Sequence, residues 1–156
     1  MTIEDDIAFL QRIPILRPLG ATALRILAIG AESSYLERGQ VLFKAGDTAD
    51  GGYIVQKGSF QLDPEKVGEN ELIAGPGTLL GESALFTETR RPATATALEV
   101  SMVLRISRGM FVKMLEGYPD AAERLRDLIA ARADEWARDF ENVRSALNPD
   151  GESNQQ

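Results

Sequence analysis

The 156-residue sequence contains no cysteine and no histidine. Without cysteine it has no disulfide framework, no thiolate zinc site and no cysteine-held iron–sulfur cluster. Without histidine it lacks an imidazole general base and the histidine ligands of haem and zinc. Most nucleophile–base pairs are therefore unavailable, and the carboxylates show no evident second member of a catalytic pair. We expect a protein that is not an enzyme and that needs no metal and no cofactor.

Basic residues and long apolar runs are also scarce. Lys and Arg together number 17 against 24 Asp and Glu, which gives a formal net charge of −7. This balance argues against a broad nucleic-acid-binding surface. No apolar run approaches the roughly 18 residues of a membrane span, and the N-terminus, MTIEDDIAFL, is acidic where a signal peptide is basic. The sequence predicts a cytoplasmic protein without direct DNA binding or membrane contact.

What is present suits one globular domain, with 44% hydrophobic and 26% charged residues. We expect a single domain over residues 1–147, followed by a disordered tail at 148–156. Within it, residues 1–33 are predicted to form N-terminal helices, 34–106 a β-roll, and 107–147 C-terminal helices.

Two apolar stripes at helical spacing occupy the N-terminal part, separated by Pro14 and Pro18. Gly30 is a plausible stop for the second helix. The stripes are Ile3, Ile7 and Leu10, then Leu24, Leu27 and Ala28.

Short β-compatible pieces alternate with glycines in the middle of the chain, which is typical of a barrel, sandwich or roll. The expected strand pieces are Val41–Phe43, Tyr53–Val55, Phe60–Leu62, Leu72–Ile73 and Val100–Leu104. The glycines expected to make turns with positive φ are Gly39, Gly46, Gly51, Gly52, Gly58, Gly68, Gly75 and Gly77.

The C-terminal part returns to helix. Ser107 is a candidate N-cap for a short helix through about Glu116, and Pro119 suits the first turn of a longer one. The longer helix carries apolar residues at steps of three and four, close to a heptad pattern near its end. These residues are Leu125, Ile129, Ala133, Trp136, Phe140, Val143 and Leu147.

The segment Gly77 to Ala97 carries the chemistry. Glu82 follows a glycine, and Arg90 and Arg91 stand in an otherwise small and apolar stretch. A single helical turn at Ser83–Phe86 exposes backbone N–H groups that favour an anion. An arginine fork suits a phosphate, and a carboxylate accepts hydrogen bonds from a sugar hydroxyl. The pattern favours a compact ligand with one phosphate and one ribose. The alternative is that Glu82 and Arg91 form only a surface ion pair.

Two motifs in order resemble the cyclic nucleotide-binding domain, the module of catabolite activators, kinase regulatory subunits and nucleotide-gated channels. The first is ERGQVLFKAGDTADGGYIVQKGSF (Glu37–Phe60), and the second is LLGESALFTETRRPAT (Leu79–Thr94). The resemblance runs from about residue 5 to 145. It implies an α+β, mainly β fold: a jelly-roll-like double-stranded β-helix, or eight-stranded β-roll, flanked by N-terminal helices and a long C-terminal helix. The phosphate-binding cassette is residues 79–94.

By this resemblance Glu82 receives the ribose 2′-hydroxyl and Arg91 the cyclic phosphate of cyclic AMP or cyclic GMP, with cyclic AMP favoured. Arg91 keeps the family's spacing from Glu82, so Arg90 is expected to be a solvated neighbour. The site residues predicted on this basis are Gly81, Glu82, Ser83, Ala84, Arg91, Pro92, Ala93 and Thr94.

Two positions depart from the family pattern. Pro92 stands where Ala, Ser or Thr is usual, and it lacks the N–H that commonly helps to hold the phosphate. The loss is about 0.5–1.5 kcal/mol, or about tenfold in affinity. It also removes a side chain that often separates cyclic GMP from cyclic AMP. Ser83 replaces a bulky apolar residue, which leaves a looser or more polar pocket wall.

The output of the domain is a further expectation. About nine residues follow Leu147, so there is no room for the helix-turn-helix domain of the family's transcription regulators. We expect a free-standing sensor that signals through movement of its C-terminal helices to a noncovalent effector protein or its own homodimer. Trp136 either caps the purine or packs in the core or a dimer interface. The competing hypothesis is a degenerate roll that binds no nucleotide and acts as a protein-interaction or dimerisation module.

Overall fold

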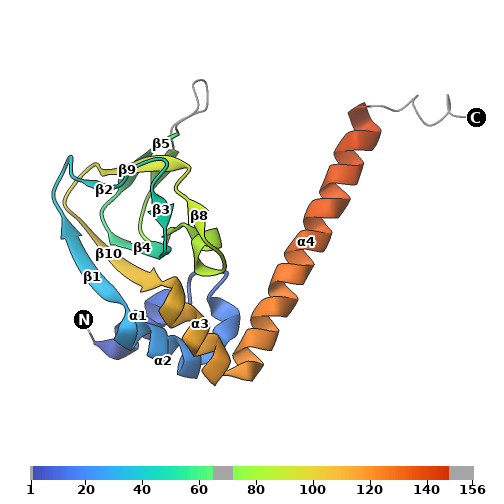
Figure 1. Ribbon diagram of the computed structural model, residues 1–156, viewed down its shortest axis with the longest axis horizontal. Helices are drawn as coiled ribbons and strands as arrows, with labels where there is room; N and C mark the ends of the chain where they lie inside the picture. Colours follow the sequence, from blue (N-terminus) through green and yellow to red (C-terminus); the bar gives the residue numbers. More distant parts are fainter. Residues whose placement is uncertain (1, 65–71, 148–156) are drawn as a thin grey trace, which may run out of the picture.

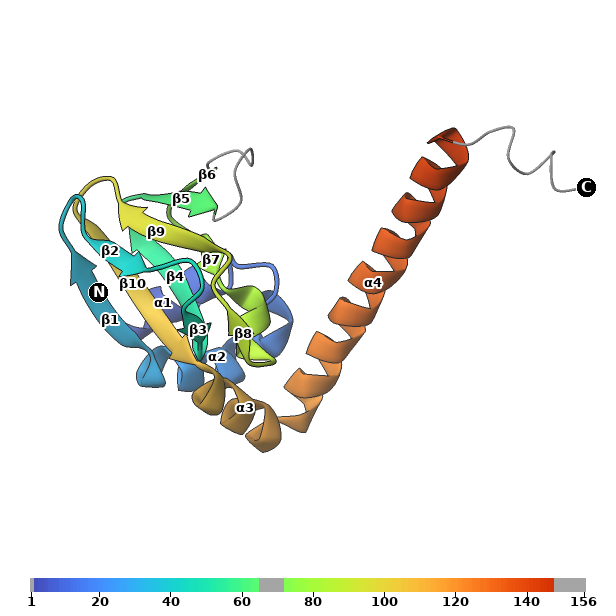
Figure 2. The same ribbon diagram turned by 45° about the horizontal axis from the view of Figure 1, so that its top comes forward.

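The computed structural model describes residues 2–64 and 72–147. A roll of short strands stands on a base of helices, and the last helix leaves that base and runs clear of the roll (Figures 1 and 2). The predicted α+β, mainly β class is confirmed. Gly68 and the tail at 148–156, for which a turn and disorder were expected, lie outside the described residues.

The N-terminal base consists of α1 (Ile3–Leu10), the 3₁₀ turn η1 (Arg17–Leu19) and α2 (Gly20–Gly30). The chain begins α1 with a capping box, because the Thr2 side chain accepts from the Asp5 N–H and the Asp5 side chain accepts from the Thr2 N–H. Pro18 lies in η1, where a missing N–H costs little. Both predicted helices and the stop at Gly30 are confirmed.

The roll is built from three antiparallel groups of strands, ordered β1-β10-β4-β7, β2-β9-β5-β6 and β3-β8. The predicted strand pieces all fall in strands, except that Val100 precedes β10. The strand bounds are β1 (Glu32–Leu36), β2 (Val41–Phe43), β3 (Thr48–Ala49), β4 (Gly51–Lys57), β5 (Phe60–Pro64), β6 (Leu72–Ala74), β7 (Leu79–Leu80), β8 (Thr89–Arg90), β9 (Ala93–Ala97) and β10 (Ser101–Ser107).

The strands β4 and β10 separate two hydrophobic cores. Successive side chains of a strand point to opposite faces, so Val55 and Val103 pack inside the roll while Ile54 and Leu104 pack against the helices. The helices therefore pack against the outer face of β4 and β10 to form one core, and the side chains inside the roll form a second, smaller core.

The turn prediction was wrong for three glycines. Gly51, Gly52 and Gly75 do not have positive φ, whereas the other described glycines of that set do. Gly51 lies in β4, and a Cβ there would collide with the backbone carbonyl of Ile106 on β10. Glycine is needed at this position for close approach of two strands rather than for a turn.

The C-terminal helices are α3 (Arg108–Gly117) and α4 (Pro119–Leu147), with Ser107 as the predicted N-cap of α3, its hydroxyl accepting from the Met110 N–H. Only the start of α4 is buried, at Ala121 and Leu125. The rest of its apolar stripe is solvent-exposed, since α4 extends past the roll without lying on it (Figure 2). None of the helices in residues 2–64 and 72–147 is both long enough and apolar enough to cross a membrane.

Candidate functional site

The predicted cassette, residues 79–94, contains β7, the single 3₁₀ turn η2 (Glu82–Leu85), β8 and the start of β9. Gly81 precedes η2 in the left-handed region, with φ 84° and ψ 41°. A Cβ on Gly81 would collide with the guanidinium of Arg91. Both the backbone conformation and the available space therefore require glycine here. Leu85 is fully buried and fixes the turn to the helical core.

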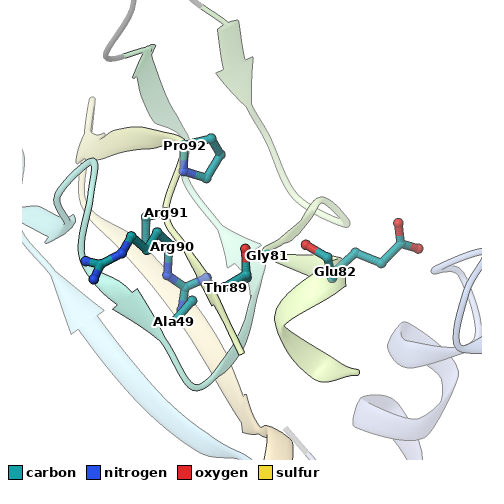
Figure 3. Close-up of a pocket in the computed structure, with 8 residues that line it drawn as sticks. Ala49, Gly81, Glu82, Thr89, Arg90, Arg91 and Pro92 are labelled. Carbon is teal, nitrogen blue, oxygen red and sulfur yellow. The ribbon is translucent and has the colours of Figure 1, made fainter. Parts of the chain in front are cut away.

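A cavity of about 260 Å³ lies beside this turn (Figure 3). A second cavity of about 90 Å³ shares Gly81, Arg91 and Pro92 with it, so the two adjoin at Arg91. The first is lined by Ala49, Gly81, Glu82, Ser83, Thr89, Arg90, Arg91 and Pro92. The second is lined by Phe43, Leu62, Leu80, Gly81, Arg91, Pro92 and Ala93. One compartment is thus rich in polar groups and the other is mainly apolar.

Arg91 lies between the two compartments and is only 5% exposed. Its Nη2 donates to the Gly51 carbonyl at 2.8 Å. Its Cζ lies 4.5 Å from the ring centroid of Phe43 and 5.4 Å from that of Tyr53. The carbonyl and the two aromatic faces hold the guanidinium in one orientation. The strands β2 and β4, which carry these partners, therefore fix the position of the cation.

The charge of Arg91 is incompletely satisfied. Among the described residues, its buried Nη1 has no hydrogen-bond partner and no carboxylate lies within 4 Å of the guanidinium. Burial lowers the pKa of Arg91, and the carboxylates of Asp50 and Asp47 act in the opposite direction. A buried N–H donor without a partner costs free energy. An anion at Nη1 would supply both the missing hydrogen bond and the missing counter-charge.

Glu82 does not pair with Arg91. Figure 3 shows its side chain extending away from both arginines of the cavity. Its carboxylate instead accepts a hydrogen bond from Nη1 of Arg132 on α4, at 3.0 Å. The alternative of a surface ion pair between Glu82 and Arg91 is therefore wrong. The side chain is half-exposed, and the residue also lines the larger cavity.

Arg90 is exposed, as expected, but it also lines the larger cavity. Its Nη1 donates to the Gly46 carbonyl at 3.0 Å, in the turn before β3. Because the bond is to a neutral carbonyl, the positive charge of Arg90 stays at the cavity rim and adds to the field of Arg91.

Two of the predicted site residues lie behind the cavity walls rather than on them. Ala84 is fully buried, and its N–H donates to the Gly81 carbonyl at 3.0 Å. The Thr94 hydroxyl accepts from the Ala45 N–H at 2.9 Å, which closes the turn after β2. Gly81, Glu82, Ser83, Arg91 and Pro92 meet at the larger cavity, and Ala93 lines only the smaller one.

The predictions made from the sequence did not include the residues that orient Arg91. Phe43 and Tyr53 were assigned only to strands, and Gly51 only to a turn. The adjacent pair Gly51-Gly52 was the available signal, since paired glycines inside a strand mark close approach of another group. Nothing in the local sequence links these positions to Arg91, which follows them by about 40 residues.

Trp136 neither packs in the core nor lines the cavity. It is 70% exposed and stacks on Phe140, with ring centroids 5.7 Å apart. The core alternative is wrong for this residue, and the dimer interface and purine cap stay predictions.

Comparison with known proteins supplies the family. Residues 34–118 match the family model described as the cyclic nucleotide-binding domain, a stretch that includes the whole cassette. The chain belongs to this family. The match runs from β1 to the end of α3, so the residues around Arg91 lie within it.

Curated relatives of this domain family are longer than the chain. The cyclic AMP receptor protein of Thermus thermophilus is 32% identical over 107 residues, which cover 64% of this chain and 50% of that protein. The cAMP-dependent protein kinase regulatory subunit of Yarrowia lipolytica is 31% identical over 109 residues, or 69% of this chain and 28% of that protein. The chain thus spans half or less of each of these relatives.

Solved structures of similar size agree with the fold. A cyclic nucleotide-binding-like protein from Brucella abortus is 38% identical, with a TM-score of 0.64, covering 72% of this chain and 98% of that one. The N-terminal domain of a transcriptional regulator from Streptomyces coelicolor is 29% identical, with a TM-score of 0.77, and the match covers 85% of this chain and 94% of that one. The cyclic nucleotide-binding fold therefore accounts for most of this chain.

Proposed function

We propose that residues 1–147 form a non-enzymatic sensor domain that binds a cyclic mononucleotide, cyclic AMP in preference to cyclic GMP, in the cavity at Arg91. The observation that carries the proposal is the buried Nη1 of Arg91, which has no partner among the described residues. A cyclic phosphodiester bears one negative charge, which matches one guanidinium in a site largely screened from water. The cytoplasmic location expected from the sequence stays a prediction.

The two compartments suit the two halves of such a ligand. The phosphate belongs at Nη1 of Arg91, and the ribose 2′-hydroxyl belongs at the carboxylate of Glu82, which also lines the larger cavity. The apolar compartment between Phe43, Leu62 and Leu80 suits an aromatic base. Both compartments are small for a ligand site, which favours a mononucleotide over a larger dinucleotide.

Signalling to α4 follows because Glu82 would contact both the bound nucleotide and α4. Arg132 on α4 and the ribose hydroxyl would take the same carboxylate, so nucleotide binding weakens a contact that ties the helix to the cassette. An exposed ion pair contributes about 0–1 kcal/mol, so this competition shifts the position of α4 rather than switching it fully. The output is a changed exposure of α4 to an effector protein or to a second copy of the chain.

A degenerate roll that serves only as a dimerisation or interaction module is the second candidate. It is favoured by the exposed apolar stripe of α4, on which Trp136 and Phe140 stack side by side. It is also favoured by Pro92 at the cavity wall, since proline offers no N–H to a phosphate.

Thermal unfolding with added ligand separates the two candidates. A ligand at 100 times its dissociation constant stabilises the folded protein by about 2.7 kcal/mol. We expect cyclic AMP to raise the Tm of the wild type, with a smaller rise for cyclic GMP and none for a cyclic dinucleotide. The rise should vanish in Arg91→Ala and persist in Arg126→Ala, which removes an exposed arginine from α4. If no nucleotide changes the Tm of the wild type or of either variant, the sensor proposal fails and only the interaction module is left.

A further inference from the structure

Arg108 is a cation that neither the cavity nor the sequence motifs single out. It is the first residue of α3 and follows β10 directly. Its backbone N–H donates to the Asp50 carbonyl at 2.7 Å, between β3 and β4. The backbone of Arg108 is therefore fixed to the roll at the point where the C-terminal helices begin.

The side chain of Arg108 reaches three backbone carbonyls with one nitrogen. Nη1 lies 3.1 Å from the Ala49 oxygen, 3.1 Å from the Ala84 oxygen and 3.0 Å from the Thr87 oxygen. The carbonyls of Ala84 and Thr87 lie at and just after the end of η2, where a helical turn leaves its last acceptors unpaired. Arg108 thus satisfies acceptors that η2 cannot satisfy by itself.

These carbonyls come from opposite sides of the ligand cavity. Ala49, at the end of β3, lines one side, and η2 supplies Glu82 and Ser83 to the other. Arg108 does not line the cavity, so it joins the two walls from behind. A second contact supports the same junction, since Phe86, which follows η2, meets Phe111 of α3 edge to face at 5.5 Å.

We infer that Arg108 is a positioning residue: it holds η2 against β3 so that Gly81, Glu82 and Ser83 face the cavity. The inference rests on the proposed function for its effect on ligand binding, whereas its effect on the turn is a property of the ligand-free chain. A charge-assisted hydrogen bond is stronger than a neutral one, and one guanidinium nitrogen lies within hydrogen-bond distance of three carbonyls here. Loss of Arg108 should loosen the cassette turn locally and leave the roll intact.

Three variants of the full chain test this role: Arg108→Ala, Arg108→Lys and the control Lys113→Ala, which removes an exposed cation from the same helix. Amide hydrogen exchange is measured without ligand at Phe86 and Thr87, whose N–H groups donate to the Ser83 carbonyl. Cyclic AMP affinity is measured by calorimetry. We expect about tenfold faster exchange and about tenfold weaker binding in Arg108→Ala. Arg108→Lys should lie between Arg108→Ala and the wild type, and Lys113→Ala should match the wild type.

The outcomes separate this inference from the proposed function. Unchanged exchange at Phe86 and Thr87 in Arg108→Ala overturns the role of Arg108. So does exchange that quickens equally in β4 and β10, because that indicates a loss of global stability. If the wild type binds no cyclic nucleotide, the proposed function fails, while the exchange comparison still decides whether Arg108 holds the turn.

Discussion

Arg91 is a positive charge kept in a place where charge is costly. Its burial lowers its pKa, and its hydrogen bond to Gly51 and its two ring contacts compensate for only part of the lost hydration. The remaining donor, Nη1, lies next to Gly81. Position 81 requires glycine because its backbone is left-handed and because a Cβ there would collide with Nη1. An anion that entered here would give Nη1 a hydrogen-bond partner and a counter-charge, so we expect the burial of this cation to contribute to the affinity for a phosphate.

Pro92 is the residue at which the cassette is expected to be weaker than in its family. Pro92→Ala restores a backbone N–H beside Arg91 and leaves the side-chain environment nearly unchanged, since Pro92 is exposed. We expect cyclic AMP to bind about threefold to tenfold more tightly, as one added hydrogen bond to a charged acceptor allows. Calorimetric titration of both proteins measures this difference. Equal or weaker binding by the variant would show that this N–H does not reach the phosphate.

At the scale of elements, the cassette lies between two arginines from the C-terminal helices. Arg108 of α3 binds its backbone carbonyls, and Arg132 of α4 binds its carboxylate. The start of α4 is anchored separately, because Arg124 donates to the carbonyls of Pro18 and Leu19 at 2.6 and 3.0 Å. The contact at Arg108 is partly buried at Ala84 and exposed at Thr87, and the contact at Arg132 is exposed. The second is therefore the one that a ligand can displace at low cost.

Removal of the α4 contact should strengthen nucleotide binding. Arg132→Ala leaves Glu82 free for the ribose, and we expect up to about fivefold tighter binding of cyclic AMP. Arg138→Ala, an exposed arginine further along α4, should bind as the wild type does. Fluorescence competition with a labelled cyclic nucleotide gives both values. Weaker binding in Arg132→Ala would mean that Arg132 contacts the ligand instead of competing with it.

At the scale of the whole molecule, much of the architecture could be predicted from sequence periodicity and turn residues. The helices follow from their stripes and caps, and β2 and β5 from short apolar pieces between glycines. The two-residue strands β3, β7 and β8 could not be predicted, because their pairing depends on partners far along the chain. The same limit applies to the site. The residue types at Glu82 and Arg91 were informative, whereas their partners Arg132 and Gly51 are brought to them only by folding.

The exposed apolar stripe of α4 predicts that two copies of the chain form a dimer. From Ile129 to Leu147 its apolar residues keep steps of four and three, the spacing of a two-helix seam. We expect a dimer in sedimentation equilibrium, and at least tenfold weaker association when Trp136→Ala and Phe140→Ala are combined, since two exposed aromatic rings lose their contact area. Ile29→Ala, an exposed apolar residue of α2, is the control. A monomeric wild type at high concentration contradicts this prediction.

The central claim is that one buried guanidinium receives the phosphate of one cyclic nucleotide. Equilibrium dialysis of cyclic AMP against the full chain tests it most directly. The account predicts saturable binding at one nucleotide per wild-type chain and no measurable binding by Arg91→Ala. A wild type that retains no nucleotide, or an Arg91→Ala variant that retains as much as the wild type, would contradict it.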